Sequence, residues 1–539
     1  MAQSSPNSGT KTQPAAAASG AVRVRRAVLS AYDKTGLAEF AKTLRKFDVQ
    51  IISTGGTMKV LDDAGIPVTS VESITGYGSM LGGRLKTLHP KLMGGILARM
   101  DSDSDRQELK DAGFNACELV VVNLYPFSKA ANDPGASLAD AIELIDVGGP
   151  TMIRAAAKNH ASVAVVCDPS DYASVAQELR ENAGSISAET RQRLAVRAFA
   201  ITAAYDATIA SHLSGKLDPH SQGRFPNMLI RQYAKSGSLR YGENPHQEAA
   251  LYRVIGEDGP SLATAPVVGS KELSYNNYGD LDAAWRMAAD FSAPFAAVFK
   301  HANPCGAATG ATLRAAYEAA YATDPLSAYG SIVALNRTVD LACAEALNET
   351  AFIECIAAPG YDPDALELMR QKKARRYVTV PTMDLGGSRT RFRELVGGLL
   401  VQDDDMRELT EADLTVVTKR APTASEIKSL LFARKVVKHA KSNAIVLAQG
   451  EAAVGIGAGQ TSRVDAVRSA VERAGERAKG AVLASDAFFP MPDGPEAAAK
   501  AGVVAMIQPG GSKRDADAIE VCNKFGIAMV FSGLRNFRH

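Results

Sequence analysis

Residues 117–127 read CELVVVNLYPF, and this stretch is the strongest indication of the fold class. Three consecutive valines in an apolar run of strand length predict a strand that is buried on both faces, as in a parallel sheet. Around this run, segments typical of strands alternate with segments of helical periodicity. Such alternation predicts an α/β domain in which helices cover a parallel sheet.

The neighbouring segments follow the same alternation. We expect further strands at residues 25–32, 49–54 and 161–167. Apolar residues at helical spacing, a terminal glycine and a plausible N-cap at Ser137 predict helices at residues 36–47, 57–65 and 137–145, followed by two helical stretches between 171 and 214.

The length of 539 residues fits two to four domains. Residues 1–22 are rich in Ser, Gly, Pro and Ala, which predicts a disordered tail. A break rich in Pro, Gly and polar residues at 216–226 predicts a boundary between a first domain at 23–220 and a second at 227–539. The second is again mixed α/β and is long enough for two similar subdomains, with a possible junction around residues 386–390.

Composition argues against several classes of protein. The net charge of +1 carries no overall footprint for nucleic acid or an anionic membrane. No apolar run reaches the ~18 residues of a membrane helix, and the N-terminus lacks the pattern of a secretory signal. The six cysteines form no CxxC pair, which favours reduced thiols in a cytoplasmic protein over a disulfide framework or a zinc site.

The clearest local motif is STGGT at residues 53–57, between an expected strand and an expected helix. The glycines would let an anion approach the N–H groups and the positive dipole end of the helix, so Thr54 and Gly55 are candidates for a phosphate cradle. The alternative is an ordinary tight turn with a threonine cap. Ser30 and Lys34, in the similarly placed SAYDKTG at 30–36, would reach the same anion if their strands are neighbours. Otherwise Lys34 is a solvated loop lysine.

Further polar residues follow at strand and helix ends. Arg84 and Lys86 in GGRLKTLHP, at 82–90, are expected in an extended segment, where residues two apart point the same way and could stabilise an oxyanion. Tyr125 lies at the end of the valine-rich strand, where ligand crevices of open α/β sheets form. Asp146 precedes an expected helix and Lys158 ends one, although each signal alone is weak.

These motifs together resemble a known family. DKTG, STGGT, GGRLKTLHP, NLYPF, IDVGGPTMIRAAAKNH and CDPSDY, in this order, resemble the inosine monophosphate cyclohydrolase domain of bifunctional purine biosynthesis proteins, whose fold is similar to methylglyoxal synthase. The resemblance implies that the residues near the nucleotide phosphate are Ser30, Lys34, Thr54 and Gly55. It implies active-site roles for Arg84, Lys86, Tyr125, Asp146 and Lys158.

The second half carries its strongest motif in KHANPCG, at residues 300–306, directly after an apolar strand. A Lys300–His301 pair at a strand end suits proton transfer, because imidazole titrates near neutral pH. A structural histidine beside a surface lysine is the alternative. The pair Pro304-Cys305 also suggests a zinc nucleoside deaminase, but that site needs HxE and PCxxC, and the chain has HAN and PCGA. We therefore expect no catalytic zinc.

Other strings in this half are individually ambiguous. GIGAGQ, at 455–460, is a weak dinucleotide motif, and SDAFFP, at 485–490, offers either a surface for a planar ring or simply core. Together, the strings of this half resemble the aminoimidazole carboxamide ribonucleotide formyltransferase domain of the same family. The strings that carry the resemblance, besides SDAFFP, are RYGENPHQ, LSYNN, KHANPCG, DPLSAYGSIVA, IAAPGY, VVTKRAPT, KSNAIV, GIGAGQTSR and LRNFRH.

That second resemblance implies a cytidine-deaminase-like fold and a homodimer with sites across the subunit interface. It also implies 10-formyltetrahydrofolate as cosubstrate and no catalytic metal, consistent with the missing zinc motif. It implies catalytic roles for Lys300, His301 and Asn443, nucleotide binding by Arg240, Tyr241 and Arg535, and folate binding by Phe488, Pro490 and Asp493. Arg434 stands where the family pattern has an aromatic residue, and Met491 where some members carry Phe. Both departures concern the folate side.

The expected function is therefore formyl transfer to the carboxamide ribonucleotide, followed by ring closure to inosine monophosphate. Two alternatives remain for the first domain. It could eliminate phosphate as methylglyoxal synthase does, or it could be a nucleotide-sensing module without catalysis.

Overall fold

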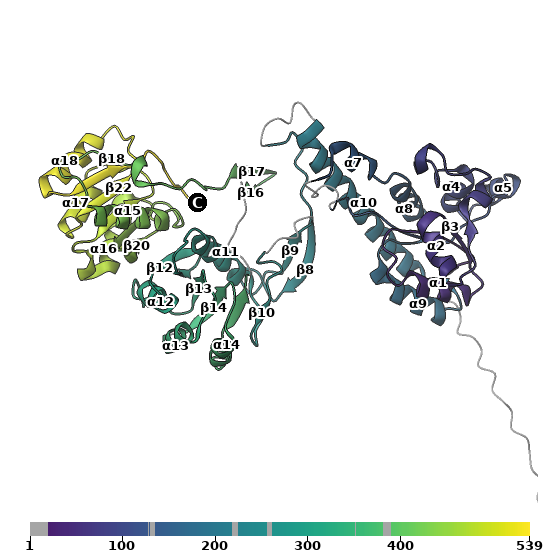
Figure 1. Cartoon of the computed structure of the whole chain (residues 1–539), viewed down its shortest axis with the longest axis horizontal. Coiled ribbons are helices and arrows are strands. Elements are labelled where there is room, and N and C mark those ends of the chain that lie inside the picture. Colours follow the sequence, from purple (N-terminus) through teal and green to yellow (C-terminus); the bar gives the residue numbers. More distant parts are fainter. Residues whose placement is uncertain are drawn as a thin grey trace, which may run out of the picture. The chain divides into compact units, whose positions relative to one another are not determined.

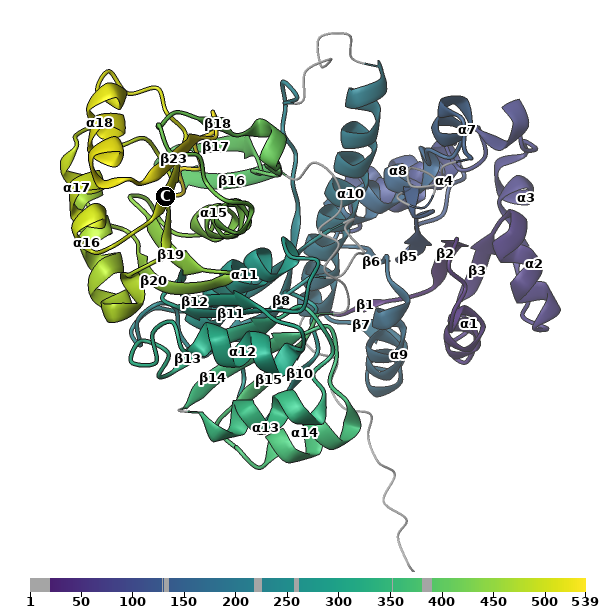
Figure 2. The ribbon, with the colours of Figure 1, turned by 60° about the vertical axis from the view of Figure 1, so that its left-hand side comes forward.

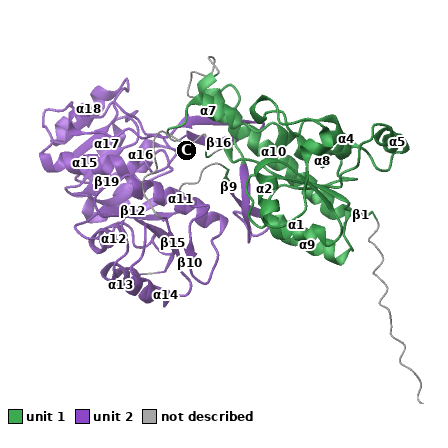
Figure 3. Ribbon diagram, turned by 45° about the vertical axis from the view of Figure 1, so that its right-hand side comes forward, with its two compact units in different colours: residues 1–232, 254–257 green, residues 233–253, 258–539 purple. Residues whose placement is uncertain are grey.

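The computed structural model describes residues 20–127, 129, 135–217, 225–255, 261–350, 352–380 and 390–539. It contains two compact units, residues 1–232 with 254–257 and residues 233–253 with 258–539 (Figure 3). Three expected features lie mostly outside the described residues. They are the tail, at 1–19, the domain boundary, at 218–224, and the subdomain junction, at 386–389. The end of the expected tail is ordered, because β1 (Val22–Arg23) pairs with β7 (Ser185–Ile186).

Unit 1 is built on a five-stranded sheet in the order β4-β3-β2-β5-β6 (Figure 1). All of its neighbouring strands are parallel. The strands are β2 (Arg26–Ala31), β3 (Gln50–Ser53), β4 (Thr69–Ser70), β5 (Leu119–Asn123) and β6 (Ala164–Val166). Residues 119–122 of β5 are buried, which confirms the strand predicted from the valine-rich run.

Helices cover both faces of this sheet. In Figure 2, α8 (Gly148–Lys158) and α10 (Ala188–Leu217) lie on one side of the strands, and α1 (Leu37–Arg45) and α9 (Tyr172–Glu181) on the other. The other helices are α2 (Gly55–Asp63), α3 (Val71–Thr75), α4 (Pro90–Leu97), α5 (Asp103–Asp111) and α7 (Leu138–Glu143), with 3-10 turns at Leu81–Gly83 and Pro169–Asp171. Ser137 caps α7 as predicted, since its hydroxyl accepts the Asp140 N–H.

The strand order creates a switch point in unit 1. From β2 the chain moves outward to β3 and β4, then returns to β5 on the other side of β2 and continues to β6. The connections on the two sides therefore diverge at the carboxyl ends of β2 and β5. Ligand crevices of open parallel sheets form at such a point.

Unit 2 is built on a twelve-stranded sheet in the order β10-β15-β14-β13-β11-β12-β20-β19-β21-β22-β23-β18. One half contains β10 (Val267–Val268), β11 (Phe295–Lys300), β12 (Asn303–Thr309), β13 (Ser331–Leu335), β14 (Ile353–Ala358) and β15 (Arg376–Thr379). The other contains β18 (Thr415–Val416), β19 (Ile445–Gln449), β20 (Ala452–Gly457), β21 (Val482–Ser485), β22 (Ala505–Gln508) and β23 (Ala528–Phe531).

The two halves repeat one topology, which confirms the prediction of two related subdomains. Each has a central antiparallel hairpin, then a strand antiparallel to it, then two parallel strands and a short antiparallel edge strand. The helices recur in the same places: α11 (Tyr275–Ala289), α12 (Leu313–Tyr321), α13 (Leu341–Glu349) and α14 (Pro363–Arg370) in one half, α15 (Ala424–Val437), α16 (Arg463–Ala474), α17 (Asp493–Lys500) and α18 (Asp515–Phe525) in the other. The halves join where β12 pairs with β20.

The sheet of unit 2 is the middle of three layers. Along β11, Phe295, Ala297 and Phe299 face a core shared with α11 and α15, whereas Ala296 and Val298 face a second core with α12, α13 and α14 (Figure 2). A matching third core lies under α16, α17 and α18. This alternation follows from the two-residue period of a strand.

Glycines in β20 let a helix lie close to the sheet. A Cβ added at Gly457 would lie 2.1 Å from the Ala466 carbonyl oxygen, and one at Gly455 would lie 2.1 Å from that of Ala470. In the other half, a Cβ at Gly306 would lie 2.0 Å from the Ala320 carbonyl oxygen. The glycine-rich string at 455–460 therefore serves strand–helix packing.

Two small hairpins lie outside the large sheets: β8 (Tyr233–Leu239) with β9 (Ala249–Val254), and β16 (Thr390–Leu395) with β17 (Gly398–Asp403). Short 3-10 turns occupy Glu411–Asp413 and Gly475–Ala478. Within the described ranges, no helix combines the length and apolar character needed to cross a membrane.

Candidate active sites

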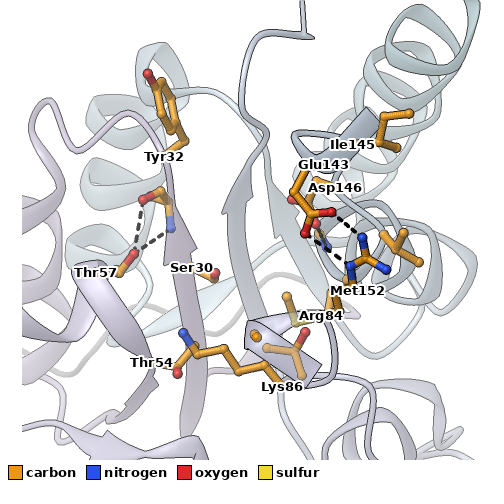
Figure 4. Close-up of a pocket in the computed structure, with 18 of the residues that line it drawn as sticks. Ser30, Tyr32, Thr54, Thr57, Arg84, Lys86, Glu143, Ile145, Asp146 and Met152 are labelled. Carbon is orange, nitrogen blue, oxygen red and sulfur yellow. Dashed lines mark hydrogen bonds and ion pairs between the residues drawn. The ribbon is translucent and has the colours of Figure 1, made fainter. Parts of the chain in front are cut away.

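A cavity of about 800 Å³ lies at the switch point of unit 1 (Figure 4). Its lining comes from the ends of β2 and β3, the segment after the Leu81–Gly83 turn, and the segment joining α7 to α8. The structure thus brings together six residues singled out in the sequence: Ser30, Lys34, Thr54, Arg84, Lys86 and Asp146.

One wall is the N-terminus of α2. Thr54 is extended at the cap position, and the first turn of the helix carries no acidic side chain and no side-chain cap. The helix starts at Gly55, two residues before the predicted start, and Gly55 has a left-handed φ of 55° directly after the cap. A Cβ at Gly55 would lie 2.5 Å from Lys86 Nζ, and in Figure 4 the Lys86 side chain extends toward Thr54. The first-turn N–H groups of this helix can hold an anion, and the Lys86 ammonium lies beside them.

Asn123, at the end of β5, holds the loop that carries Lys34, which follows the neighbouring strand β2. The Asn123 side chain at the end of β5 accepts the Asp33 N–H at 2.8 Å and donates to the Asp33 carbonyl oxygen at 2.8 Å. Lys34 Nζ donates to the Tyr32 carbonyl oxygen at 3.0 Å. Strands β2 and β3 are neighbours, which is the condition for Ser30, Lys34 and Thr54 to share one anion.

Arg84 lies on the other side of the cavity, paired with Glu143 (Figure 4). Arg84 Nε donates to Glu143 Oε1 at 3.1 Å, and Nη2 donates to Oε2. The hydrogen bonds hold the pKa of Glu143 below its ordinary value and that of Arg84 above. The expectation of an extended segment was wrong: Leu81 and Gly82 have φ values of 53° and 65°, and Met80 bridges to Leu85, so the glycines form a tight turn.

Asp146 is held at the N-terminus of α8. Its Oδ1 accepts the Gly149 N–H at 2.9 Å, and its own N–H donates to the Tyr205 hydroxyl at 2.7 Å. A Cβ at Gly149 would lie 2.3 Å from Asp146 Oδ2, so glycine leaves the space that the carboxylate occupies. The carboxylate therefore has a fixed orientation at the cavity wall.

Three predicted residues of the first site lie outside the lining: Gly55, at the start of α2, Tyr125 and Lys158. The Tyr125 ring packs edge-on against Tyr32, which does line the cavity, with ring centroids 4.7 Å apart. Lys158 is exposed at the far end of α8 from Asp146, and the structure does not bring it to the cavity.

Unit 2 has a smaller cavity, of about 340 Å³, beyond the carboxyl end of β21. Four predicted residues line it: Asn443, Phe488, Pro490 and Asp493. Met491 also lines it, as expected for a residue of the predicted folate side. The polar amide, the aromatic ring and the carboxylate thus converge on one pocket, which is the arrangement typical of small-molecule sites.

The amide of Asn443 is fixed from both ends. Its Nδ2 donates to the Gln460 carbonyl oxygen at 2.9 Å, and its Oδ1 accepts from Arg463 Nη2 at 2.7 Å. Arg463 in turn pairs with Asp486, whose side chain is fully buried. Sequence reasoning missed Arg463 as a site residue, although it ends the string GIGAGQTSR.

Lys300 and His301 lie at the turn between β11 and β12. Lys300 Nζ donates to the carbonyl oxygens of Tyr329, at 2.6 Å, and Gly330, at 3.2 Å. Asn303 Oδ1 accepts the Lys441 N–H at 3.0 Å, which joins this turn to the segment that carries Asn443. The pair does not line the 340 Å³ cavity itself.

The predicted nucleotide-gripping residues lie in two further places. Arg240 stacks on the Tyr241 ring, with Cζ 4.7 Å from its centroid, and neither lines the cavity of unit 2. Asn276 Nδ2 donates to the Glu243 carbonyl oxygen at 3.2 Å, so the RYGENPHQ and LSYNN strings meet. Arg535 lies over the ring of Phe537, which lines the cavity.

Comparison with known proteins shows the family of this chain. Residues 156–473 match the family model described as AICARFT/IMPCHase bienzyme, and residues 36–151 match an MGS-like domain. The bifunctional purine biosynthesis protein PurH of Halalkalibacterium halodurans is 48% identical over 515 residues, which cover 96% of this chain and 100% of that protein. The chain belongs to the AICARFT/IMPCHase bienzyme family.

PurH of Bacillus cereus strain AH820 is 47% identical to this bienzyme, with the same coverage of both chains. The crystal structure of ForH matches 35% of the bienzyme and 96% of its own chain at 39% identity, with a TM-score of 0.32, which is too low for a structural argument. Both family resemblances read from the sequence are confirmed, as is the predicted α/β class with an MGS-like first domain.

The cysteines of the bienzyme are all buried. Burial raises the pKa of the Cys305 thiol to about 12, so this residue of the KHANPCG string is protonated at neutral pH. In the described part of the chain, no group of three or more His, Cys, Asp or Glu side chains is placed to hold a metal ion. The expectation of metal-free catalysis stays a prediction.

Proposed function

We propose that this bienzyme transfers a formyl group from 10-formyltetrahydrofolate to the aminoimidazole carboxamide ribonucleotide and then closes the ring to inosine monophosphate. One observation carries the proposal: six residues from four separate segments converge on the cavity of unit 1, where an anion site faces Arg84 and Asp146. Family membership supports both reactions, and the formyltransferase domain implies a folate-type cosubstrate.

Formyl transfer belongs to unit 2. The amine of the ribonucleotide attacks the formyl carbon, and His301 takes the amine proton as the bond forms. Lys300 stabilises the negative charge that develops on the formyl oxygen, and Asn443 orients the reacting groups. Tetrahydrofolate then leaves. Phe488, Pro490 and Asp493 hold the folate, and the nucleotide is bound by Arg240, Tyr241 and Arg535.

Ring closure belongs to unit 1. The nucleotide phosphate binds at the α2 N-terminus, with Ser30, Lys34, Thr54 and Gly55 around it. The carboxamide nitrogen then attacks the formyl carbon of the same molecule, and holding both groups close together supplies much of the acceleration. Lys86 and Arg84 stabilise the oxyanion, and Tyr125 and Asp146 move protons as water is lost. Resemblance alone assigns Lys158 to this step.

A homodimer in the cytoplasm, with formyltransferase sites shared between subunits, completes the proposal. The resemblance of unit 2 to the family supports the dimer. Sedimentation velocity of the full chain tests it, because a monomer at micromolar concentration would contradict shared sites.

The decisive assay combines the full chain, the carboxamide ribonucleotide and 10-formyltetrahydrofolate. Release of tetrahydrofolate together with inosine monophosphate supports both activities. Release with only the formylated nucleotide would favour a nucleotide-sensing role for unit 1. A separate assay offers dihydroxyacetone phosphate to the full chain. Its consumption would favour phosphate elimination by unit 1 instead of ring closure.

Lys86→Ala separates the two reactions. Removing the ammonium beside Gly55 takes away a charge that stabilises the oxyanion, so we expect cyclohydrolase kcat to fall by roughly 100-fold or more while formyl transfer continues. Chromatography should then show the formylated nucleotide accumulating. Lys59→Ala, an exposed lysine of α2, is the matched control. Undiminished inosine monophosphate formation by Lys86→Ala would refute the role of Lys86.

A further inference from the structure

The turn between β11 and β12 has an unusual backbone. The strands pair up to Lys300 and Asn303, so only His301 and Ala302 connect them. Both have left-handed φ values, 52° and 58°, and neither is glycine. A side chain makes this conformation costly, so it persists only where surrounding contacts hold it, most often at functional sites.

The repeated half provides an internal comparison. There, Gly450 and Glu451 connect β19 to β20, since Gln449 pairs with Ala452. The left-handed position in that turn is taken by a glycine, Gly450, with φ 58°. The first half therefore places an imidazole where the related turn uses a residue that accepts the conformation without strain.

Asp280 is the side chain that holds the turn. It lies in the second turn of α11, and its Oδ1 accepts the Ala302 N–H at 2.7 Å. Burial raises the pKa of the Asp280 carboxyl above its ordinary value, and the hydrogen bond from the Ala302 N–H opposes part of this rise. The Asp280 side chain thus holds the strained turn directly, through the N–H of its second residue.

The helix gives Asp280 a rigid base. Ser274 and Asn277 form a capping box at the start of α11, and the helix packs on β11 and β13. The neighbours of the turn are held separately, Lys300 by the carbonyl groups of Tyr329 and Gly330, and Asn303 by Lys441. In the part of the chain that the structure describes, Asp280 makes the one side-chain hydrogen bond to the two connecting residues, at Ala302.

We infer that Asp280 is a positioning residue for formyl transfer, which holds the left-handed turn and so aims the imidazole of His301 at the reacting amine. The inference rests on the proposed role of His301 as the proton acceptor. The carboxylate does not touch the substrate in this account. It acts through the backbone of the turn, and removing it lets the turn relax and misplaces the imidazole.

The test compares Asp280→Ala with Asp280→Asn in the full-length protein. Asp280→Ala should lower the kcat of formyl transfer on the order of 100-fold, the cost of misplacing a reacting group, with a smaller change in KM. Asp280→Asn keeps an acceptor oxygen and should retain most of the kcat. Cyclohydrolase activity, measured with the formylated nucleotide, should stay unchanged in both. Asp282→Asn, an exposed residue of the same helix, is the matched control.

A second substitution tests the strain itself. Glycine adopts the left-handed conformation freely, so adding Ala302→Gly to Asp280→Ala should restore kcat by about tenfold. A folded double variant no faster than Asp280→Ala would overturn the inference. So would an Asp280→Ala protein within about twofold of wild type.

Two further results bear on the inference: an Asp280→Ala protein that does not fold, and a wild-type protein without formyl transfer. If Asp280→Ala does not fold, Asp280→Asn is compared with Asp280→Glu, in which the acceptor moves by one methylene, and equal rates in these two overturn the inference. A folded wild-type protein without formyl transfer would contradict the proposed function itself. By contrast, an active wild type whose Asp280 variants keep the wild-type kcat would contradict only the role of Asp280.

Discussion

At the residue scale, the Arg84 guanidinium can pair either with Glu143 or with a bound anion. In the structure it is paired with Glu143, yet the proposed ring closure needs its guanidinium at the oxyanion. Both side chains are largely exposed, 67% and 59%, so water screens the pair and a bound anion competes with it readily. We therefore expect Glu143 to compete with a bound anion for the Arg84 guanidinium.

Glu143→Gln removes that competition. We expect the variant to bind inosine monophosphate more tightly, with a Kd lower by about two- to fivefold, a change typical of an exposed ion pair. Isothermal titration calorimetry measures it. Glu39→Gln, which breaks the exposed Glu39–Lys42 pair of α1, is the control and should leave the Kd unchanged. Weaker binding by Glu143→Gln would mean that Glu143 supports the site.

His439 makes unit 2 sensitive to acid. Burial lowers the pKa of this imidazole to about 4, and the nearby charges of Lys438 and Arg538 lower it further. The hydrogen bond between Nε2 and Asp290 opposes this lowering but does not cancel it. An unfolded histidine titrates near 6.5. Between these two values the unfolded chain binds the extra proton and the folded chain does not. The contribution of His439 to stability is therefore present above about pH 6.5 and is lost as pH falls toward 4.

The wild-type protein should thus lose about 1–2 kcal/mol of unfolding free energy between pH 7 and pH 5 through this group. The fluorescence of Trp285, the single tryptophan and a buried residue of α11, reports urea unfolding of unit 2. His439→Gln cannot take up the proton, so its unfolding free energy should change less over the same range. An identical pH slope in both proteins would show that other groups cause the acid sensitivity.

At the scale of elements, the approach of α16 to β20 depends on glycine. Gly457→Ala would place a methyl group 2.1 Å from the Ala466 carbonyl oxygen, a backbone atom that cannot move away cheaply. We expect a loss of about 1–3 kcal/mol of unfolding free energy, as for other overpacked cores. Urea unfolding followed by Trp285 fluorescence measures it. Gly398→Ala in β17, where a Cβ meets nothing within 4 Å, should have little effect.

Local patterns predicted most elements of unit 1, because strand and helix periodicities are written in neighbouring residues. The predicted strands at 25–32 and 49–54 correspond to β2 and β3, and the predicted helix at 36–47 corresponds to α1. The segment around Arg84 was predicted wrongly. Two glycines next to a polar run fit an extended segment and a tight turn equally well, and the bridge from Met80 to Leu85 decides between them.

At the scale of the whole molecule, the C-terminal segment contacts the surroundings of the cavity in unit 2. The Asn536 N–H donates to the Asp486 carbonyl oxygen at 2.9 Å, and the Arg538 carbonyl oxygen accepts the Ser442 N–H at 2.9 Å. Arg434, the departure from the family pattern, is buried and donates to the Leu534 carbonyl oxygen. Three contacts thus join this segment to the surroundings of Asn443.

Deleting residues 534–539 should therefore abolish formyl transfer and leave ring closure intact. The deletion removes the hydrogen-bond partner of a buried guanidinium and uncovers the segment before Asn443, whereas unit 1 is a separate compact unit. Assaying both reactions on the truncated chain tests this, with cyclohydrolase activity as the internal control. Loss of both activities would show that unit 1 depends on unit 2, and retention of formyl transfer would show that the segment is dispensable.

Sequence patterns predicted the class of fold and the family, and they named six residues that line the cavity of unit 1 and four that line the cavity of unit 2. Periodicity, turn residues and ordered motifs are properties of the chain and need no tertiary contact to be read. Which motifs meet depends on tertiary contacts. Arg84 and Glu143 are 59 residues apart, Asp280 and Ala302 are 22 apart, and Asn443 and Arg463 are 20 apart. No local pattern records these pairs, because packing of helices on the sheets creates them.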